Sequence, residues 1–411
     1  MAGPVELRTI AHDLGVASVL EGSVRRAGNR LKVNAQLVSA VDGGVLWAEE
    51  YDRELQDLFD VQDDIARSIV GALRMKVGGS TFTASSRRRP GNMHAYDAYL
   101  RGRHLLTTRT NRDAAFQAKR YFEQALSYDS TFAQAHAGLS DVHTRLAVFG
   151  FEPPQQGFAK AKAAARRALA IDSTVAEAHT SLGHVLCVAE FDWTSAEKAF
   201  RRAVSLYPSY TFARLPFAIC LMSEGRYAAA AAQLDTARSF DPLAPAVSNV
   251  LGRLHVIMRQ PDKAIRYLNE ALELNPQMDL AYQQLGHAYL QKGMSAEAIA
   301  ALRQAASLSG PRDSAQLAYA YAVTGQRAEA ERIVRGLLDS PRRGTLPYHI
   351  AMAYTGLGDA DEAFRWLEIG HTTRASFMNS LMVDPAFEAL HSDRRWARLL
   401  RRMGLEPRAA P

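Results

Sequence analysis

The sequence has only two cysteines, Cys187 and Cys220, in 411 residues. Two cysteines cannot form a disulfide scaffold, and both stand among apolar residues in segments that are expected to be helical. We interpret them as small buried hydrophobic residues rather than as a redox pair. The sequence also lacks an apolar run of the roughly 18 residues that a membrane span needs, and the N-terminus has no signal-like apolar core. These absences predict a soluble chain that is cytoplasmic or of unknown compartment.

Motifs for catalysis and cofactor binding are also missing. The sequence contains no Gly-x-x-x-x-Gly-Lys-Ser/Thr loop, no Gly-x-Gly-x-x-Gly after a predicted strand and no Gly-x-Ser-x-Gly elbow. Histidines pair along two predicted helices, at His136 and His143 and at His179 and His184, but none forms a His-Glu-x-x-His zinc motif. We therefore expect no enzyme, no cofactor and no metal.

The charge is modest and scattered. The formal net charge is +6, with 22% charged residues, and part of the excess comes from Arg87, Arg88 and Arg89 and from the arginines near the C-terminus. A nucleic-acid binder usually gathers basic residues on one face with aromatic residues between them. No such stripe is present, so we expect no nucleic-acid partner.

Four columns of residues recur every 34 residues along the centre of the chain. The columns are Ala203, Ala237, Ala271 and Ala305; Pro208, Pro242 and Pro276; Phe217, Leu251 and Leu285; and Ala218, Gly252 and Gly286. A fixed period of this length indicates a repeat architecture, because each unit has an apolar face that only its neighbours can bury.

The columns fit a hairpin of two helices. Ala298, Leu302 and Ala305 stand at i, i+4 and i+7, which is one apolar face of a second helix. The small Gly286 on the first helix would let the two helices cross closely. Pro276 ends the preceding helix, because proline cannot continue it and disfavours helical geometry one residue earlier.

This pattern resembles the tetratricopeptide repeat, whose unit has the same residue types at these offsets. The resemblance implies a mostly α fold, an alpha-alpha superhelix or solenoid, over residues 94–372 with about eight hairpins. We expect hairpins to begin near the following residues, the first two being degenerate: Ala95, Ala133, Ala176, Thr211, Pro245, Asp279, Pro311 and Gly344.

Residues 373–405 are predicted to form capping helices at the end of the array, followed by a tail at 406–411. Asp384 is suited to cap one helix with Pro385 in its first position, and Ser392 or Asp393 is suited to cap the next. Apolar residues such as Phe387 would face the array.

The first ninety residues differ in kind. Residues 5–14 and 60–77 have helical patterns, residues 17–26, 30–41 and 45–51 alternate as strands do, and residues 78–93 have the composition of a linker. Residues 1–77 therefore predict a small α/β domain that precedes the repeats.

Two runs in this domain, LGVASVLEGSVRR at 14–26 and LWAEEYDR at 46–53, closely resemble the TolB amino-terminal-like domain. In bacteria that domain stands between a membrane segment and tetratricopeptide repeats in receptor-type adenylate cyclases, serine/threonine kinases and CadC-like regulators. Such domains begin with a strand and helix upstream of the match, so we expect a partial domain and a fragment-like chain. The resemblance implies a regulatory or sensory role, periplasmic if a membrane anchor precedes it, and carries over no catalytic activity.

In tetratricopeptide hairpins the first helix lines the concave side of the superhelix. Alignment of the repeats predicts these groove residues: Tyr99, Arg103, His184, Ile219, Asn249, Arg253, Gln283, His287 and Tyr319. The same residues could instead pack against neighbouring helices. The main hypothesis is a non-enzymatic protein–protein interaction scaffold that binds a peptide, extended or helical, in this groove. The alternative is a small-molecule sensor whose N-terminal unit binds the ligand, and self-association through the N-terminal sheet edge is a further expectation.

Overall fold

The computed structural model describes residues 9–11, 15–28, 30–54, 64–65, 68, 92–108 and 112–405. Contacts divide the chain into two units, Met1–Met93 and His94–Pro411, and each is described by itself. The helix predicted at 60–77, the linker at 78–93 and the tail at 406–411 lie largely or wholly outside the described residues.

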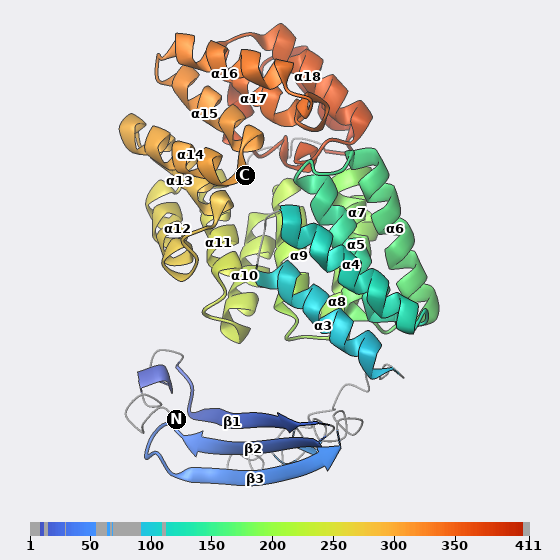
Figure 1. Ribbon diagram of the computed structural model, residues 1–411. Helices are drawn as coiled ribbons and strands as arrows, with labels where there is room; N and C mark the ends of the chain where they lie inside the picture. The colour runs from blue at the N-terminus through green and yellow to red at the C-terminus, as the bar shows by residue number, and fades with distance from the viewer. Residues whose placement is uncertain are drawn as a thin grey trace. The chain divides into compact units, whose positions relative to one another are not determined.

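The first unit contains an antiparallel sheet in the order β1-β2-β3 (Figure 1), and this confirms the three predicted strands. The strands are β1 (Ser18–Ala27), β2 (Arg30–Ser39) and β3 (Val45–Glu54). Side chains alternate between the two faces of a strand, and in β2 Leu31 and Val33 are buried together with Tyr51 of β3. One face of the sheet therefore carries a small apolar core.

The described residues of the second unit form eight helical hairpins, which follow one another along the chain (Figure 1), and a further segment after them. The first helices are α3 (Met93–Thr108), α5 (Ala133–Val148), α7 (Ala176–Val185), α9 (Thr211–Ser223), α11 (Pro245–Ile257), α13 (Asp279–Gln291), α15 (Pro311–Val323) and α17 (Pro347–Leu357). The second helices are α4 (Arg112–Tyr128), α6 (Pro154–Ile171), α8 (Trp193–Leu206), α10 (Tyr227–Phe240), α12 (Pro261–Leu274), α14 (Ser295–Ser309), α16 (Arg327–Asp339) and α18 (Ala360–Thr373). The helical superhelix predicted from the 34-residue period is confirmed.

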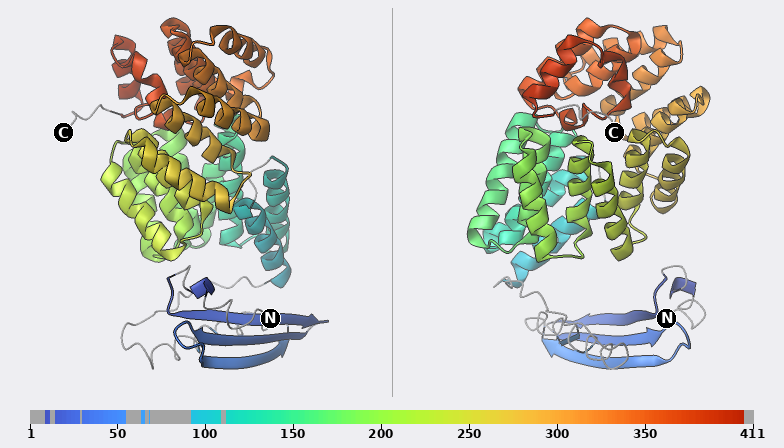
Figure 2. Two further views of the ribbon diagram at one scale, coloured as in Figure 1. Left: turned by 90° about the vertical axis from the view of Figure 1, so that its left-hand side faces the viewer. Right: turned by 180° about the vertical axis from the view of Figure 1, so that it is seen from behind.

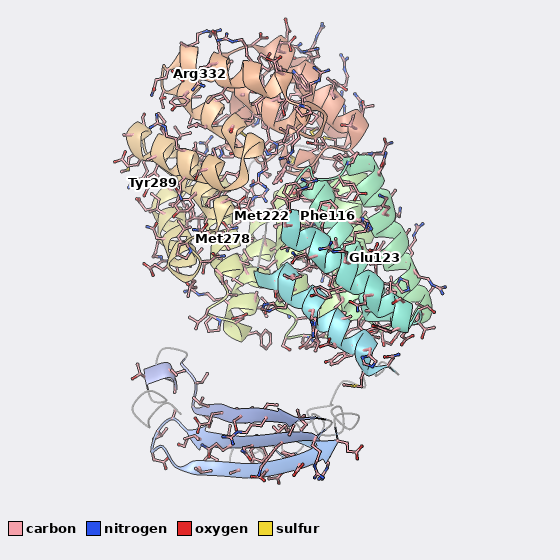
Figure 3. All side chains as sticks on the ribbon, in the orientation of Figure 1. Phe116, Glu123, Met222, Met278, Tyr289 and Arg332 are labelled. Carbon is pink, nitrogen blue, oxygen red and sulfur yellow. The ribbon has the colours of Figure 1, made fainter. Side chains whose placement is uncertain are left out.

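The small residues of the repeat mark close helix crossings. A β-carbon at Gly286 would lie 2.4 Å from Cγ of Leu302, and one at Gly252 would lie 2.5 Å from Cγ of Leu268. Both leucines are completely buried. Only glycine leaves room for the leucine at these two crossings. On the outer faces of the helices, side chains such as Glu123 are exposed to solvent (Figure 3).

After α18 the chain forms two short 3-10 helices, η4 (Met378–Ser380) and η5 (Pro385–Leu390), and then α19 (Arg394–Arg402). The side chain of Asp384 accepts a hydrogen bond from the backbone N–H of Ala386, and that of Asp393 accepts one from Arg395. Both caps stand where the sequence predicts them. α19 lies against α18, where Arg402 Nη1 donates to Glu368 Oε2 at 2.7 Å.

This C-terminal segment, residues 375–405, does more than cap the last hairpin. Ser376 Oγ donates to the backbone oxygen of Ala147 in α5 at 3.0 Å, and Asn379 Nδ2 donates to Ser223 Oγ of α9 at 3.0 Å. The segment therefore lies beside the second to fourth hairpins as well as the eighth (Figure 2). The stacked hairpins curve, and this curvature brings the end of the array back toward helices that are far away in sequence.

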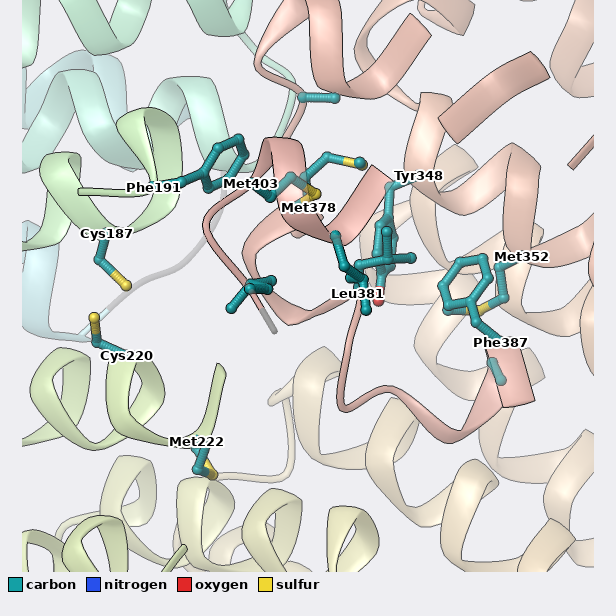
Figure 4. Packing of buried hydrophobic residues seen from close by; sticks show 14 of the residues in the cluster. Cys187, Phe191, Cys220, Met222, Tyr348, Met352, Met378, Leu381, Phe387 and Met403 are labelled. Carbon is teal, nitrogen blue, oxygen red and sulfur yellow. The ribbon is translucent and has the colours of Figure 1, made fainter. Parts of the chain in front are cut away.

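The two cysteines lie in adjoining helices near this segment. Cys187 in the π-helix η2 (Leu186–Glu190) and Cys220 in α9 are buried, and their side chains point toward one another (Figure 4). Burial raises the pKa of the Cys187 thiol. Both residues belong to the main hydrophobic cluster, as expected for small buried apolar groups.

Candidate functional site

The second unit contains a partly open cavity of about 410 Å³ on the inner side of the first helices. Its wall is formed by residues of α3, α5, α7, α9, α11, α13, α15 and α17 together with the C-terminal segment. First helices face inward because their outward sides pack on the second helices. The cavity is therefore a product of the superhelix and of the segment that returns to it.

A fully bonded ionic cluster lies on α3, α5 and α7. Arg103 Nη1 donates to Asp141 Oδ2 at 3.1 Å, and Ser181 Oγ donates to Asp141 Oδ1 at 2.5 Å. Arg103 Nη2 also reaches the hydroxyl oxygen of Tyr210 at 3.3 Å. Burial raises the pKa of Asp141, while Arg103 acts in the opposite direction. Arg103 and Asp141 neutralise one another, and the positively charged Arg145 lines the same part of the wall.

A second polar cluster lies on α13, α15 and α17. Asp279 Oδ2 forms a buried ion pair with Arg312, and His287 Nε2 bonds to Gln316 Oε1 at 2.5 Å. Neither ring nitrogen of His349 has a hydrogen-bond partner in the described part of the chain. Burial lowers the pKa of His349 to about 3, so its imidazole is neutral near pH 7.

Between these clusters, Asn249 and Arg253 stand one helical turn apart on α11, opposite Gln283 of α13. Arg253 Nη2 donates to Ser380 Oγ at 2.6 Å, and within residues 92–405 this guanidinium makes no ion pair. Burial lowers the pKa of Arg253. The amide oxygens of Asn249 and Gln283 are buried without a partner among the described residues. This central part of the wall therefore has two buried acceptors without a donor in the described part of the chain.

Comparison with known proteins supports the repeat assignment. A family model described as tetratricopeptide repeat matches residues 188–254 and 256–309. Residues 188–254 and 256–309 of the chain are tetratricopeptide repeats. Its helices from α8 to α14 fall within the matched residues, and the hairpins on either side continue the same arrangement.

Known proteins that resemble the chain cover parts of it. A putative adenylate cyclase 3 from Rhizobium meliloti (strain 1021) is 42% identical over 135 residues, which are 33% of this chain and 23% of the relative. The human IFIT1 dimer with m7Gppp-AAAA shares the fold with a TM-score of 0.51 at 16% identity, over 85% of this chain and 80% of IFIT1. A tetratricopeptide repeat protein from Parabacteroides merdae has a TM-score of 0.43 at 13% identity, over 66% of this chain and all of its own length (100%).

Seven of the nine predicted groove residues line the cavity of the repeat array. They are Arg103, His184, Ile219, Asn249, Arg253, Gln283 and His287. Burial lowers the pKa of His184 to about 4. The shared position of these residues on first helices is what brings them together.

Tyr99 and Tyr319 lie outside the cavity wall. The ring of Tyr99 packs between Phe132 and Phe122, with ring centroids 5.1 and 5.9 Å away. Tyr319 packs against α17 beside Gly356, and burial raises its pKa to about 12. Both rings fill interfaces between hairpins, because a large ring at this position reaches the neighbouring helix.

Several wall residues were not predicted from the sequence. On the first helices these are Thr144, Arg145, Ser181, Asp279, Gln316 and His349. Arg145 follows Asp141 by four residues and Asp279 precedes Gln283 by four, so the helical period could have indicated both. Ser380 and Asp384 come from the C-terminal segment, where no repeat pattern points inward.

The described residues contain neither a membrane-spanning helix nor a cluster of metal ligands. None of the described helices is long and apolar enough to span a membrane. Among residues 9–11, 15–28, 30–54, 64–65, 68, 92–108 and 112–405, no three His, Cys, Asp or Glu side chains gather as metal ligands would.

Proposed function

We propose that this protein is a non-enzymatic interaction scaffold that takes a peptide segment of a partner into the cavity of its repeat array. The observation that carries the proposal is the convergence of residues from eight first helices on one cavity, where the buried amide oxygens of Asn249 and Gln283 have no partner among the described residues. Buried polar groups are nearly always bonded, so unbonded ones beside a cavity indicate a missing polar partner or ordered water.

The size of the cavity restricts how a peptide could bind. A volume of about 410 Å³ lies within the roughly 300–1,000 Å³ range of small-ligand pockets. A helix with side chains is about 10–12 Å across, whereas an extended segment is narrower and needs less of this volume. The proposed ligand is therefore a few residues in extended conformation, rather than a helix.

The same volume favours a second function, that of a small-molecule sensor. The ligand would then bind inside the array, rather than in the N-terminal unit. Polar side chains that line a cavity beside apolar ones such as Ile219 and Val250 are typical of small-molecule pockets. The repeat array would transmit binding through the C-terminal segment that closes the cavity.

For the biological setting, we propose the sensory or assembly part of a bacterial signalling protein. The proposal is supported by the relative named as a putative adenylate cyclase and by the resemblance of residues 14–26 and 46–53 to TolB amino-terminal-like domains. On this proposal the chain itself carries no cyclase chemistry, and its compartment follows that of the longer protein.

Selection of peptides tests the scaffold function. Two libraries of random peptides are selected for binding to the full chain, one with the random residues at a free C-terminus and one with them inside a longer sequence. The affinities of the best binders are then measured by titration. The double variant Asn249→Ala with Gln283→Ala should weaken them by about 1–3 kcal/mol, the usual effect of lost hydrogen bonds to buried groups. The control is Glu123→Ala with Arg332→Ala, which lies on exposed outer faces.

Melting temperatures of both double variants should stay near that of the parent, because the two amide oxygens have no bond to lose among the described residues. Equal binding by the Asn249/Gln283 variant and the parent would remove the cavity from consideration. The outer faces and the N-terminal sheet would then be the next candidates.

A further inference from the structure

We propose that the repeat array has a second binding site, outside the cavity, which takes a phosphate group carrying two negative charges. The site lies at a seam where the beginning of the array meets its end. Its anchors are Arg112, the first residue of α4, and Arg342, in the turn between α16 and η3 (Arg343–Thr345). Neither arginine lines the cavity, so this inference goes beyond the proposed function and does not depend on it.

The seam joins parts of the chain that are far apart in sequence. Arg342 Nη2 donates to the backbone oxygen of Phe149 at 2.9 Å and to that of Gly150 at 3.4 Å, across 193 and 192 residues. On α15, Arg312 Cζ lies 4.9 Å from the ring centroid of Phe149. The turn between α5 and α6 is therefore held by the seventh hairpin and by the turn that follows α16.

Two further phenylalanine rings at the seam each lie under a guanidinium. Arg342 Cζ is 5.3 Å from the ring centroid of Phe151, and Arg112 Cζ is 5.4 Å from that of Phe116. Phe151 and Phe116 pack on the same hydrophobic cluster, and Phe149 stacks on Phe151 with ring centroids 6.3 Å apart. A ring below a guanidinium holds its plane and leaves the N–H groups at its edge available to a ligand.

The charges that gather at the seam have the same sign. Burial lowers the pKa of Arg342, and the positive charges of Arg312 and Arg112 lower it further. Arg312 has a counter-charge, because it forms an ion pair with Asp279. In the described part of the chain Arg342 and Arg112 form no ion pair. An anion placed between these two guanidinium groups would relieve their repulsion.

The acidic residues near the seam do not supply that anion. The carboxylate of Glu152, at the end of the turn after α5, is already bonded to Lys160. Asp113, in the first turn of α4, is exposed, and it is not among the charges that act on Arg342. The missing negative charge must therefore come from outside the described residues.

Arg342 also has hydrogen-bond donors to spare. A guanidinium has five N–H donors, and those on Nη2 serve the turn after α5. Its Nε is buried without a partner among the described residues, and Nη1 makes no hydrogen bond to them. The guanidinium of Arg112 is exposed and is likewise unbonded there. Donors of two arginines, from two distant elements, are therefore available to one ligand.

The geometry favours a phosphate over a carboxylate. A carboxylate has one charge and two oxygens, which a single guanidinium fork satisfies. A phosphate group with two charges and three oxygens can bond two forks at once, and its charge matches two guanidinium groups. The same chemistry is offered by free inorganic phosphate and by the phosphate ester of a small metabolite.

Calorimetric titration of the full chain at constant ionic strength tests the site with three probes. Inorganic phosphate is the free ion, glycerol 3-phosphate is a phosphate ester of a small metabolite, and acetate is an anion with a single charge. We expect at least one of the two phosphates to bind, and acetate to bind at least about tenfold more weakly, since it can satisfy only one guanidinium.

Arg112→Gln is the decisive variant, because Arg112 is exposed and holds none of the hydrogen bonds of the seam. It should weaken phosphate binding about tenfold, as expected for the loss of a charge-assisted hydrogen bond. Arg266→Gln is the matched control, since Arg266 is also exposed and its Cζ lies 4.8 Å from the ring centroid of Tyr267 on α12. That control should stay within about twofold of the parent, because salt screens a distant charge.

A variant of the second anchor tests the fork itself. Arg342→Lys keeps the charge and removes the planar fork, and it should also weaken phosphate binding. If this variant fails to fold, because Arg342 holds the turn after α5, Arg112→Gln and the comparison of probes on the parent still decide the matter.

Each outcome decides between the alternatives. Tighter binding of inorganic phosphate supports the free ion as the ligand, and equal or tighter binding of glycerol 3-phosphate supports an ester. Equal affinity for acetate, no binding of either phosphate, or unchanged phosphate affinity in Arg112→Gln overturns the site. Phosphate should not compete with peptides selected on the cavity, and competition would place the anion in the cavity instead of at the seam.

Discussion

The indole Nε1 of Trp193 donates a hydrogen bond to the backbone oxygen of Met403 at 3.0 Å, between residues 210 positions apart. Trp193 begins α8 in the third hairpin, and Met403 follows α19 at the end of the described chain. The contact joins the third hairpin to the C-terminal segment. A linear stack of repeats would lack such a bond, because each repeat would contact only its neighbours.

Trp193→Phe should therefore lower the free energy of unfolding by about 1–3 kcal/mol, since it leaves the buried carbonyl of Met403 without its donor. Trp366→Phe is the matched control. Trp366 is also buried, but its Nε1 has no partner in the described part of the chain, so the same truncation loses ring volume and no hydrogen bond. Chemical denaturation measures both variants. Equal losses would show that the bond to Met403 does not contribute.

The helix crossings give a second prediction. Gly286→Ala should destabilise the array by about 1–3 kcal/mol through overpacking, because the new β-carbon would meet Leu302. Gly336→Ala, in the interior of α16 with nothing near the added carbon, should stabilise it by roughly 0.5–1 kcal/mol through helix propensity. Thermal denaturation compares the two. A stabilised Gly286→Ala would mean that the crossing can open. Gly286→Ala combined with Leu302→Ala should recover part of the packing.

The repeat array could be predicted because its physics is local and periodic. Small residues such as Gly252 and Gly286 recur every 34 residues because the two helices of each hairpin must cross closely there. Six of the eight predicted hairpin starts coincide with the first residue of a helix, including Thr211 and Asp279. The predicted start of the last hairpin, Gly344, lies instead in a short 3-10 turn, η3 (Arg343–Thr345), and α17 begins after it at Pro347.

The rest of the site depends on contacts without a period. Arg253 and Ser380 are 127 residues apart, and the sequence around Ser380 has no pattern that points into the superhelix. The same limit applies to Tyr99 and Tyr319, which hold groove positions in the repeat but turn toward neighbouring helices. Alignment of repeats identifies a helix face, but the size of the side chain decides whether it lines the cavity or fills an interface.

The buried histidines predict a loss of stability in acid. His349, with a folded pKa of about 3 caused by burial and by the nearby Arg312, is protonated more easily when unfolded, where its pKa is about 6.5. Its contribution is therefore present above pH 6.5 and is lost as pH falls toward 3, by up to about 1.4 kcal/mol per pH unit. Between pH 7 and pH 5 this amounts to about 2 kcal/mol.

His349→Phe should remove that part of the pH dependence while keeping the ring contacts with Tyr348 and Phe377. A smaller slope should remain from His184, whose pKa burial lowers to about 4. Urea denaturation at pH 5 and pH 7 measures the difference for parent and variant. An unchanged pH dependence in the variant would mean that His349 is solvated or bonded in the folded state.

The division into two units predicts that the repeat array folds alone. A fragment of residues 93–411 should give a strongly helical circular dichroism spectrum and melt cooperatively, because its hydrophobic clusters draw on the second unit. The full chain, measured in parallel, should melt at a similar temperature. A disordered spectrum of the fragment would show that the array needs the N-terminal unit.

The N-terminal sheet gives the last prediction. In the described residues β1 pairs with β2 alone, so its other edge presents unpaired backbone groups, and Leu20 and Val24 on this strand are 50% and 67% exposed. Open, apolar edge strands pair with other strands, and charged side chains on them oppose such pairing. We expect concentration-dependent self-association in sedimentation experiments, or otherwise faster amide exchange in residues 17–51 than in the central hairpins.

Leu20→Lys with Val24→Lys should reduce the association, whereas Val41→Lys, in the turn after β2 and 84% exposed, should leave it unchanged. A strict monomer with uniformly slow exchange would mean that the edge of β1 is already covered, and equal association of all three proteins would place the contact elsewhere.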